Sequence, residues 1–569
     1  MSKIMLGLGG SDHDFSAALT IDRDIRVAIE QERLSRRKHG AWLWYESPVK
    51  KAIDYCLAAE SGSMAQVDVI VSSDILPRRV THELKEYPVR LYPHHLCHAA
   101  SAYMMLPSEV KAGILVYDGF GSPKGRDPTH PDRNCRETFS FFLFGPDGFK
   151  CIGQTLGLGF IEDDFPTSIT NSVGMLYELV TSLLGYYPTD CGKTMGLSSY
   201  GEPQYVEALE NFITYGDEVS ACFQCATDNP ALVDTIEGII HTERGSFSVR
   251  ADLAASLQAI TNKALLHCSC FFRGHDMDFL CLSGGCALNT VANSFLVEHS
   301  TLDVPIVIPP HCGDSGIALG ALWLEQFRRT RKAPQFTFRG QALSPAVSRP
   351  GRRYSLNERR AAVHQFYPRI ALDASIVSSA DLARSIADGA IVGLFNNGSE
   401  MGPRALGGRS IIADPRLAMT RERINRSIKD REPYRPLAPL VLESKYDEYF
   451  VDNRNADPFM LKIARVTERC RKVAPAIVHV DGTARVQVVP DDGDPLLIEL
   501  LQSFEQVTGV GLLINTSFNR RGEPIVESPL DAIDAFLGLG LDGLYLDGEF
   551  YRPVGSTTPS TSRTPETAS

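Results

Sequence analysis

The chain has 569 residues, 43% of them hydrophobic, which is enough to bury several cores and indicates about three or four domain-sized units. Its formal net charge of −12 argues against a large nucleic-acid-binding surface, although local basic pockets remain compatible with it. No apolar run approaches the roughly 20 residues that span a bilayer, and the first residues have too short an apolar core for a secretory signal. Thirteen cysteines without framework spacing indicate a reducing, cytoplasmic setting. The Cys-x-x-Cys pair Cys222 and Cys225 is interpreted as buried thiols, with zinc or redox function as the less favoured alternative.

Two stretches of the first half share one pattern, an apolar strand that ends at a glycine-rich turn and is followed by a hairpin. The first occupies residues 3–32 and the second residues 113–154. A duplicated unit of this kind within one domain is what an actin/sugar-kinase-like (ASKHA) fold shows, with the two turns facing each other across a phosphate. The sequence therefore predicts an α/β domain of this class in the first half of the chain.

Helices and strands continue to alternate after these two units. An apolar stripe predicts a helix over residues 251–273. The elements expected next are a strand at 279–285, a helix from Ala287, a strand at 304–310 and a helix opened by residues 313–327. This alternation again favours α/β architecture.

The remaining chain predicts a linker, a second domain and a tail. Residues 331–352 are polar and aperiodic and are predicted to be a linker or a domain-joining excursion. A second α/β domain is expected over residues 354–553, and the Ser/Thr/Pro-rich residues 554–569 are expected to be disordered. Inside the second domain we expect helices at 381–388 and 496–502 and strands at 390–396 and 509–515.

The stretch YPHHLCHAASAYMM, residues 92–105, contains three histidines. His94 and His98 are four residues apart, so on a helix their rings lie on one face, and such pairs commonly offer two nitrogens to one metal ion. The small residues that follow are compatible with a helix that packs closely against a neighbour. A polar helix start with solvated histidines explains the same residues, so the spacing alone leaves both interpretations open.

Other candidate residues lie beside glycine turns. His13 follows the first turn and has an unperturbed pKa near neutrality, which suits a general base as well as a simple loop hydrogen bond. Asp118 ends an apolar strand, where a carboxylate can ligate a cation. Asp314 lies at a predicted helix start, where a carboxylate can also be a cap. Lys193 lies between glycines and is either a phosphate partner or a solvated loop lysine.

The second half places basic side chains beside glycine and proline, in stretches that otherwise look buried. They are Arg404, Lys429, Arg431, Arg435 and Arg485, accompanied by Asn515. Buried arginine is costly unless it meets an anion, and its planar guanidinium suits phosphate or carboxylate. Surface salt bridges are the alternative for each residue alone, but the set as a whole favours an anion pocket.

Eight motifs in this order resemble the carbamoyltransferase family of nodulation-factor and antibiotic O-carbamoyltransferases. They are HHLxHA (94–99), YDGxG (117–121), GKxMGL (192–197), SGGxxLN (283–289), GDxGxALG (313–320), GPRALGxRS (402–410), KxRExxRPLAP (429–439) and NTSFNxxGEPI (515–525). The similarity begins with HDFSAAL and EQERLSRRKHG near the start and spans nearly the whole chain. Any one motif would be weak, but the ordered set is highly specific.

The resemblance implies that residues 1–340 form a threonylcarbamoyl-transferase-like, actin-related domain that binds metal and nucleotide. It also implies a threonylcarbamoyl-AMP-synthase-like (YrdC-like) domain at 354–553 for carbamoyl phosphate. Family members use ATP to make carbamoyl adenylate and transfer the carbamoyl group to a hydroxyl of a small molecule. An acceptor from antibiotic biosynthesis or other secondary metabolism is therefore expected, with no nucleic-acid or membrane partner, and a homodimer is left open.

The family's functional residues carry over motif by motif. The implied metal ligands for Fe²⁺ or another divalent metal are His94, His98, Asp118 and Asp314, whereas His95 breaks the four-residue spacing. His13 would be the base, and Lys38 would lie near the acceptor. The implied ATP contacts, with Mg²⁺ on the nucleotide, are Gly119, Gly121, Lys193, Gly284, Gly285 and Asn289. The implied carbamoyl phosphate contacts are Arg404, Lys429, Arg435, Arg485 and Asn515.

Four rival functions are less compatible with these residues. A threonylcarbamoyl transferase acting on tRNA is disfavoured by the acidic balance and by the two fused domains. A hydrogenase-maturation carbamoyltransferase would need an acylphosphatase unit and paired zinc fingers, and a sugar kinase would not need the histidine pair. An inactive binding protein is disfavoured by the complete set of polar motif residues. The sequence does not identify the acceptor molecule.

Overall fold

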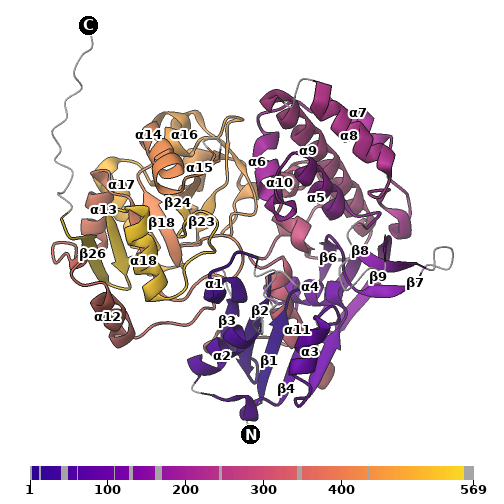
Figure 1. Ribbon diagram of the computed structural model, residues 1–569, viewed down its shortest axis with the longest axis horizontal. Helices are drawn as coiled ribbons and strands as arrows, with labels where there is room; N and C mark the ends of the chain where they lie inside the picture. The colour runs from indigo at the N-terminus through magenta and orange to yellow at the C-terminus, as the bar shows by residue number, and fades with distance from the viewer. Residues whose placement is uncertain are drawn as a thin grey trace.

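The computed structural model of the protein describes residues 3–11, 14–39, 49–60, 62–107, 109–126, 132–160, 169–242, 246–342, 349–432 and 435–555. The predicted base His13 lies outside the described residues, as do residues 556–569 of the predicted tail. Three lobes surround a central region, with the N-terminal sheet, a group of helices and the C-terminal sheet each forming one lobe (Figure 1). Within the described ranges, none of the helices has the length and apolar content that crossing a membrane would require.

The first sheet is built around β1, whose glycine-rich end leads into the first turn. β1 pairs antiparallel with β2, which pairs antiparallel with β3, and on its other side β1 runs parallel to β4, which is parallel to β5. The five strands are β1 (Ile4–Gly9), β2 (Ser16–Ile21), β3 (Asp24–Glu30), β4 (Val69–Ser73) and β5 (Val89–Tyr92). Short helices cover this sheet, namely α1 (Gln31–Ser35), α2 (Lys50–Ala59) and α3 (Arg78–Glu83).

The second sheet repeats this strand order around β6. β6 pairs antiparallel with β8, which pairs antiparallel with β9, and β6 is parallel to β12, which is parallel to β13. The strands are β6 (Ala112–Tyr117), β8 (Arg133–Gly145), β9 (Gly148–Phe160), β12 (Phe279–Ser283) and β13 (Ile306–Val307), with β7 (Pro123–Arg126) on the edge. The duplication confirms the predicted actin/sugar-kinase-like fold of this part of the chain.

Helices α4 (His94–Tyr103) and α11 (Ile317–Thr330) lie between the two sheets. Small residues let them approach each other: a Cβ added at Gly320 of α11 would lie 1.9 Å from the Cys97 carbonyl oxygen of α4. This contact confirms the expectation of a closely packed helix after the histidines. It also fixes the histidine face of α4 relative to the start of α11.

A helical lobe follows the second hairpin and contains the predicted helix 251–273. That helix is α9, which begins at residue 247 because the Ser246 side chain accepts a hydrogen bond from the Val249 amide. The helices of the lobe are α5 (Val173–Leu183), α6 (Cys191–Ser198), α7 (Val206–Glu210), α8 (Pro230–Thr242), α9 (Phe247–Ser269) and α10 (Thr290–His299). The minor strands β10 (Ile213–Thr214) and β11 (Gln224–Cys225) form a separate pair.

One sequence expectation about this half was wrong, and another is made specific by the structure. The helix expected from Ala287 begins at Thr290, because Asn289 caps it and residues 285–288 form a tight turn. Residues 331–352, expected to be a linker or a domain-joining excursion, contain two strands, β14 (Thr337–Phe338) and β15 (Gln341–Ala342), and β14 pairs with β3 at the edge of the first sheet. Strands of two residues are too short to produce a readable alternation.

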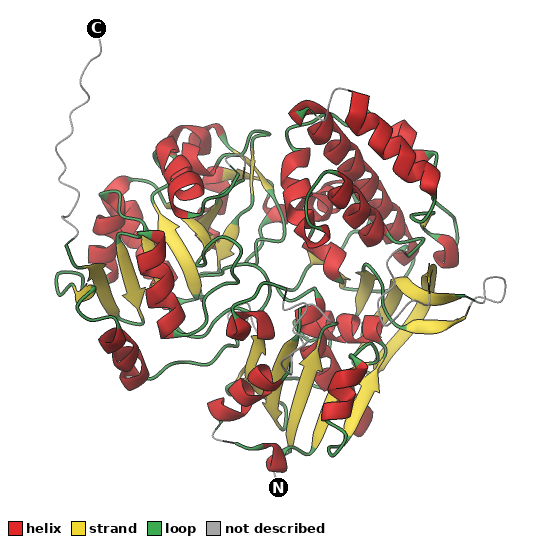
Figure 2. Cartoon of the chain, viewed as in Figure 1, coloured by secondary structure: helices red, strands yellow, loops and turns green. Residues whose placement is uncertain are grey.

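The C-terminal lobe is a mixed eight-stranded sheet with helices on both faces (Figure 2). Alternation along the strands separates two cores: Val392 and Leu394 pack with α13 and α17, whereas Phe395 packs with α12 and α18. In sheet order the strands are β16 (Ile370–Leu372), β26 (Glu549–Pro553), β25 (Gly543–Leu546), β17 (Val392–Phe395), β18 (Arg409–Ala413), β24 (Leu512–Ser517), β19 (Ala438–Leu442) and β23 (Gln487–Val489). The covering helices are α12 (Leu356–Gln365), α13 (Ser379–Ala387), α17 (Pro495–Thr508) and α18 (Pro529–Leu539).

Smaller elements complete the C-terminal lobe and carry part of its basic sequence. They are α14 (Ala418–Glu422), α15 (Tyr446–Tyr449), α16 (Glu468–Val473) and the three-stranded sheet of β20 (Phe450–Val451), β21 (Ala464–Val466) and β22 (Thr483–Ala484). The helices and strands expected at 381–388, 390–396, 496–502 and 509–515 correspond to α13, β17, α17 and β24.

Buried polar contacts join the C-terminal lobe to the other two. Arg33, which is only 1% exposed, donates to the Gly402 carbonyl oxygen at 2.8 Å and pairs with Glu30 at 2.7 Å. Asn293 donates to the Leu461 carbonyl oxygen at 2.9 Å. Part of the charged run EQERLSRRKHG is therefore buried between lobes, and the loop that contains Gly402 is held against the N-terminal half.

Candidate active site

The two histidines come together because α4 begins directly at His94, after Pro93. One helical turn separates His94 from His98, and their Nε2 atoms lie 3.2 Å apart. Both side chains are almost completely buried. A solvated polar helix start, the alternative left open by the sequence, is therefore wrong for this pair.

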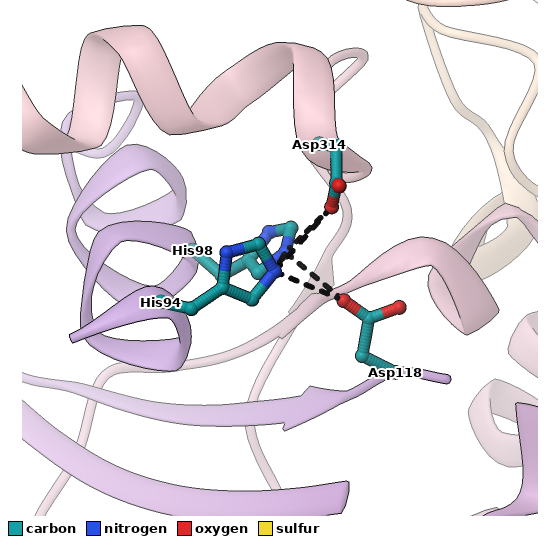
Figure 3. A group of neighbouring side chains, drawn as sticks. All are labelled: His94, His98, Asp118 and Asp314. Atoms are coloured by element: carbon teal, nitrogen blue, oxygen red, sulfur yellow. Dashed lines mark hydrogen bonds and ion pairs between the residues drawn. The ribbon is translucent and has the colours of Figure 1, made fainter. Parts of the chain in front are cut away.

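Two aspartates close the group from the opposite side (Figure 3). Asp118 follows β6, and its Oδ1 accepts hydrogen bonds from the backbone amides of Gly119 and Gly285 at 2.8 and 3.0 Å. Its Oδ2 is thereby directed at the histidines, 3.5 Å from Nε2 of His94 and 3.2 Å from Nε2 of His98. Asp314, in the turn before α11, places Oδ1 3.4 and 3.3 Å from the same nitrogens.

The four donor atoms fit a divalent metal ion. All lie within 4.8 Å of one another. Metal–ligand bonds of about 2.0–2.1 Å in a tetrahedral shell place neighbouring donors about 3.3 Å apart, which matches the nitrogen–oxygen distances here. Burial lowers the pKa of His94, but Asp314 and Asp118 outweigh it and raise that pKa to about 10. Two buried carboxylates facing two imidazoles thus favour a bound positive charge, and imidazole with carboxylate suits iron(II) and similar metals.

His95 lies outside this group, although it is buried in the same helix. Its ring centre is 6.0 Å from that of His94 and 6.4 Å from that of His98, and its Nδ1 lies 2.8 Å from the Ser140 hydroxyl. Burial lowers its pKa to about 4, despite the nearby Glu137 carboxylate. Glu137, which was not among the predicted site residues, accepts hydrogen bonds from the backbone amides of His95 and Ser122 at 3.3 and 3.1 Å. This carboxylate links the start of α4 to the loop that contains Asp118.

The predicted nucleotide residues mostly shape the turns beside this centre. A Cβ at Gly284, whose φ is +95°, would lie 2.2 Å from the Tyr117 carbonyl oxygen, so only glycine fits there. A Cβ at Gly121 would lie 2.4 Å from the His95 ring, whereas one at Gly119 would meet nothing closer than 3.8 Å. The Gly285 amide is taken by Asp118.

Asn289 and Lys193, the two predicted nucleotide contacts with polar side chains, already have protein partners. Asn289 accepts from the Ala292 amide at 3.0 Å and exchanges hydrogen bonds with Gln258. Lys193 is on helix α6 rather than in a loop and pairs with Asp190 at 2.8 Å. Its Nζ also lies 3.9 Å from a Glu432 carboxylate oxygen of the C-terminal lobe.

Three half-buried arginines of the C-terminal lobe, Arg404, Arg431 and Arg485, form a cluster of positive charge. Desolvation lowers the pKa of Arg404 to about 10 and that of Arg431 to about 9, with Arg435 acting in the same direction on both. Desolvation, followed by Arg404, Arg435 and Arg431, holds the pKa of Arg485 well below its usual value. Among the described residues, none of the three guanidiniums has an ion pair with a carboxylate, and each has a buried nitrogen without a partner. These are the features of a site for an anion.

Lys429, Lys38 and Arg435 border this arginine cluster. The Lys429 ammonium donates to the carbonyl oxygens of Ser517 and Asn519 at 2.9 and 2.7 Å. Burial is the largest cause that lowers its pKa, followed by Arg431, Arg435 and Lys38. Lys38 is exposed, and its charge also lowers the pKa of Lys429. Arg435 is half-buried, and its Nη1 lies 3.9 Å from a Glu432 carboxylate oxygen.

The arginine cluster lies beside the loop that carries Asp314. Arg404 donates to the Leu288 carbonyl oxygen at 3.5 Å, and Cys312, two residues before Asp314, acts on the Arg404 pKa. A Cβ at Gly402 would lie 2.0 Å from the Pro310 carbonyl oxygen. The sequence treated the two groups as belonging to separate domains, but the fold brings them to one junction.

A second group of potential ligand atoms, which sequence reasoning also missed, lies next to Lys38. Asp14, Glu32 and His39 place their donor atoms within 4.8 Å of one another, and His39 Nδ1 is 3.1 Å from Asp14 Oδ1. Burial, together with the charges of Glu30 and Asp14, raises the pKa of Glu32 to about 7. These residues lie in the stretches HDFSAAL and EQERLSRRKHG, but their spacing in the sequence does not show that the fold brings them together.

The arginine cluster predicts an anion-dependent stability. Inorganic phosphate should raise the Tm at pH 8, because it offsets the mutual repulsion of the cluster. Chloride should raise the Tm less, because the planar guanidinium binds two oxygens of one phosphate at once. Thermal unfolding with phosphate, against chloride at matched ionic strength, checks this. Equal increases with the two anions would contradict it.

Two family matches identify the class of protein to which this chain belongs. Residues 76–323 match the family described as "Carbamoyltransferase N-terminus" and residues 383–552 match "Carbamoyltransferase C-terminus". The chain belongs to the carbamoyltransferase family and is a carbamoyltransferase, which confirms the resemblance found in the sequence.

Two nodulation proteins and one solved structure illustrate the similarity. The chain is 32% identical to nodulation protein NolNO of Sinorhizobium fredii, over 94% of this chain and 78% of that protein. It is 36% identical to nodulation protein NolO of Bradyrhizobium diazoefficiens, over 79% of this chain and 77% of that protein. The crystal structure of T. kodakarensis HypF aligns with 57% of this chain and 48% of its own, at 12% identity and a TM-score of 0.34, which is too weak to support an argument.

Proposed function

We propose that this carbamoyltransferase is an ATP-dependent O-carbamoyltransferase that makes carbamoyl adenylate from carbamoyl phosphate and then carbamoylates a hydroxyl of a small molecule. The proposal rests on the place where the histidine–aspartate group and the arginine cluster meet. A half-buried arginine cluster, which has no carboxylate partner in the described part of the chain, lies next to the loop of Asp314, and Asp314 faces the histidine pair. An anion-binding half and a metal-binding half at one junction suit an activation step followed by a transfer step.

The proposed chemistry balances through two intermediates. Hydrolysis of carbamoyl phosphate consumes one water and gives carbamate and phosphate. A carbamate oxygen attacks the α-phosphorus of ATP, which releases pyrophosphate and forms carbamoyl adenylate. The acceptor hydroxyl attacks the carbamoyl carbon, loses its proton and displaces AMP. A carbamoyl group is a poor electrophile, so the mixed anhydride supplies the leaving group that the second transfer needs.

Each group of residues has an assigned part in this scheme. Arg404, Arg435 and Arg485 would neutralise the phosphate of carbamoyl phosphate, with Lys429 and Asn515 at the base of the pocket. His94, His98, Asp118 and Asp314 would hold a divalent cation, Fe²⁺ being our first choice. When bound, this cation supplies positive charge to stabilise the oxyanion that develops at the carbamoyl group.

The remaining assignments rest on the sequence motifs. His13 would accept the proton of the hydroxyl, and the exposed Lys38 would contact the acceptor. The nucleotide, with Mg²⁺, would lie against Gly119, Gly121, Lys193, Gly284, Gly285 and Asn289. Because the side chain of Asn289 caps α10, its backbone is the better candidate for a nucleotide contact.

We also propose the domain assignment that the resemblance implied. Residues 1–340 would be the threonylcarbamoyl-transferase-like domain, and residues 354–553 a YrdC-like domain for carbamoyl phosphate. The mixed eight-stranded sheet with the arginine cluster at its edge supports the second assignment. The acceptor would be a secondary metabolite or antibiotic precursor, and the enzyme would work in the cytoplasm.

The products of the reaction test the proposed function. With carbamoyl phosphate, ATP and a panel of hydroxylated acceptors, we expect AMP, pyrophosphate and phosphate to form together, which ion-exchange chromatography measures. Without an acceptor, wild-type enzyme should still exchange labelled pyrophosphate into ATP when carbamoyl phosphate is present. Transfer at full rate in the absence of any nucleotide would overturn the adenylate scheme.

A further inference from the structure

Two buried side-chain amides lie in contact at the base of the arginine cluster. Asn515 of β24 is 1% exposed and Gln487 of β23 is 5% exposed. Asn515 Nδ2 donates to Gln487 Oε1 at 2.6 Å and to the Ala405 carbonyl oxygen at 3.0 Å. Gln487 Nε2 donates to the Leu406 carbonyl oxygen at 3.1 Å.

The two backbone carbonyls determine which way both amides point. A carbonyl oxygen only accepts hydrogen bonds, so the NH₂ group of Gln487 must face Leu406 and that of Asn515 must face Ala405. Gln487 then presents Oε1 to Asn515, which uses the second hydrogen of the Asn515 NH₂ group. Reversing either amide would bring two acceptors together.

This arrangement leaves Asn515 Oδ1 as an acceptor with no partner among the described residues. A buried carbonyl oxygen without a partner is costly, which points to a donor supplied by a ligand. Its two anchors are close in the sequence to arginines of the cluster: Ala405 follows Arg404 directly, and Gln487 lies two positions after Arg485. Because both hydrogens of the Asn515 NH₂ group are used, this side chain has nothing to offer a phosphate oxygen.

A carbamoyl group carries the donor that this site lacks. Phosphate oxygens are acceptors and suit the guanidiniums, whereas the carbamoyl NH₂ is a donor and suits Asn515 Oδ1. An acetyl group has a methyl in place of that NH₂ and would leave the oxygen buried and unpaired. We propose that Gln487 fixes the orientation of the Asn515 amide, so that the free Asn515 oxygen accepts a hydrogen bond from the carbamoyl NH₂. This contact makes the arginine cluster selective for carbamoyl phosphate over acyl phosphates.

This inference rests on the proposed carbamoyl phosphate site and deepens it. Gln487 would be a positioning residue, because it acts through Asn515. Sites that hydrogen-bond a polar ligand group reject the analogue that lacks it, and we expect at least about tenfold discrimination.

Two stable phosphonates give a direct test, since phosphonoacetamide and 2-oxopropylphosphonate differ only by NH₂ against CH₃. Titration calorimetry with wild-type protein should show about tenfold tighter binding of the amide. In Asn515→Leu, which keeps the shape of the side chain, the amide should bind no better than the ketone. In Gln487→Met the ratio of the two Kd values should also fall, because Asn515 is free to turn.

Inorganic phosphate serves as the control for folding and for the anion site. Its Kd should stay within about twofold of wild type in both variants, because phosphate does not use Asn515 Oδ1. Equal binding of the two phosphonates by wild type, or equal weakening of all three ligands in Asn515→Leu, would overturn the inference while leaving the anion site intact. Failure of wild type to bind phosphate or either phosphonate would overturn the proposed site and this inference with it.

Discussion

Replacing His98 by alanine should remove the bound metal and abolish carbamoyl transfer, and His94→Ala should do the same. Both Nε2 atoms face Asp118 Oδ2 and Asp314 Oδ1 at 3.2–3.5 Å, so either change leaves two buried carboxylates with an incomplete partner set. Changes in residues that merely support metal ligands cost about 10–100-fold in affinity, so loss of a ligand should cost at least about 100-fold. Elemental analysis of the purified protein and competition with a chelator measure this.

His95→Asn is the matched control, because His95 belongs to the same helix turn and is equally buried. Its side chain bonds the Ser140 hydroxyl instead of facing the aspartates. We therefore expect the variant to retain metal at wild-type stoichiometry, even where its Tm falls. Full metal occupancy in both His94→Ala and His98→Ala would contradict the assignment of the site.

Replacing Arg485 by methionine should weaken carbamoyl phosphate binding by about 10–100-fold, the size of a charged hydrogen bond lost from a buried site. Methionine keeps much of the aliphatic stem, so packing is largely preserved. The same change should leave the Tm of the anion-free protein unchanged or higher, because the charge of Arg485 is opposed by Arg404, Arg435 and Arg431. Calorimetry and thermal unfolding provide the two readouts.

Arg454→Met is the control for this second prediction. Arg454 is 60% exposed and pairs with Asp452 on the same lobe. Its removal should change neither carbamoyl phosphate affinity nor Tm appreciably, since exposed ion pairs contribute little to stability. A fall in Tm of anion-free Arg485→Met with unchanged affinity would instead mark Arg485 as a structural residue.

The local parts of the fold and site were predictable because their signals lie close together in the sequence. The duplicated strand, glycine turn and hairpin are visible as two similar stretches, and the spacing of His94 and His98 follows directly from helix geometry. The placement of Asp118 and Asp314 opposite them came from motif resemblance, and the structure brings these residues together.

Contacts between distant segments could not be predicted in this way. Nothing local marks Arg33 as a buried bridge to Gly402, nor Glu137 as the acceptor for the first turn of α4. The two-residue strands β14 and β15 are stabilised by pairing with a sheet edge rather than by their own pattern. The pairing of Gln487 with Asn515 depends on strands β23 and β24 both flanking β19, which only the sheet order reveals.

The separation of activation from transfer is the central claim, and one assay tests it most directly. Carbamoyl adenylate is supplied directly, without carbamoyl phosphate or ATP, and the carbamoylated acceptor is measured in a single turnover. Arg485→Met should transfer the group at close to the wild-type rate, whereas His98→Ala should form no product. Equal loss of transfer in both variants would contradict it, because the arginine cluster and the histidine–aspartate centre would then act in the same step.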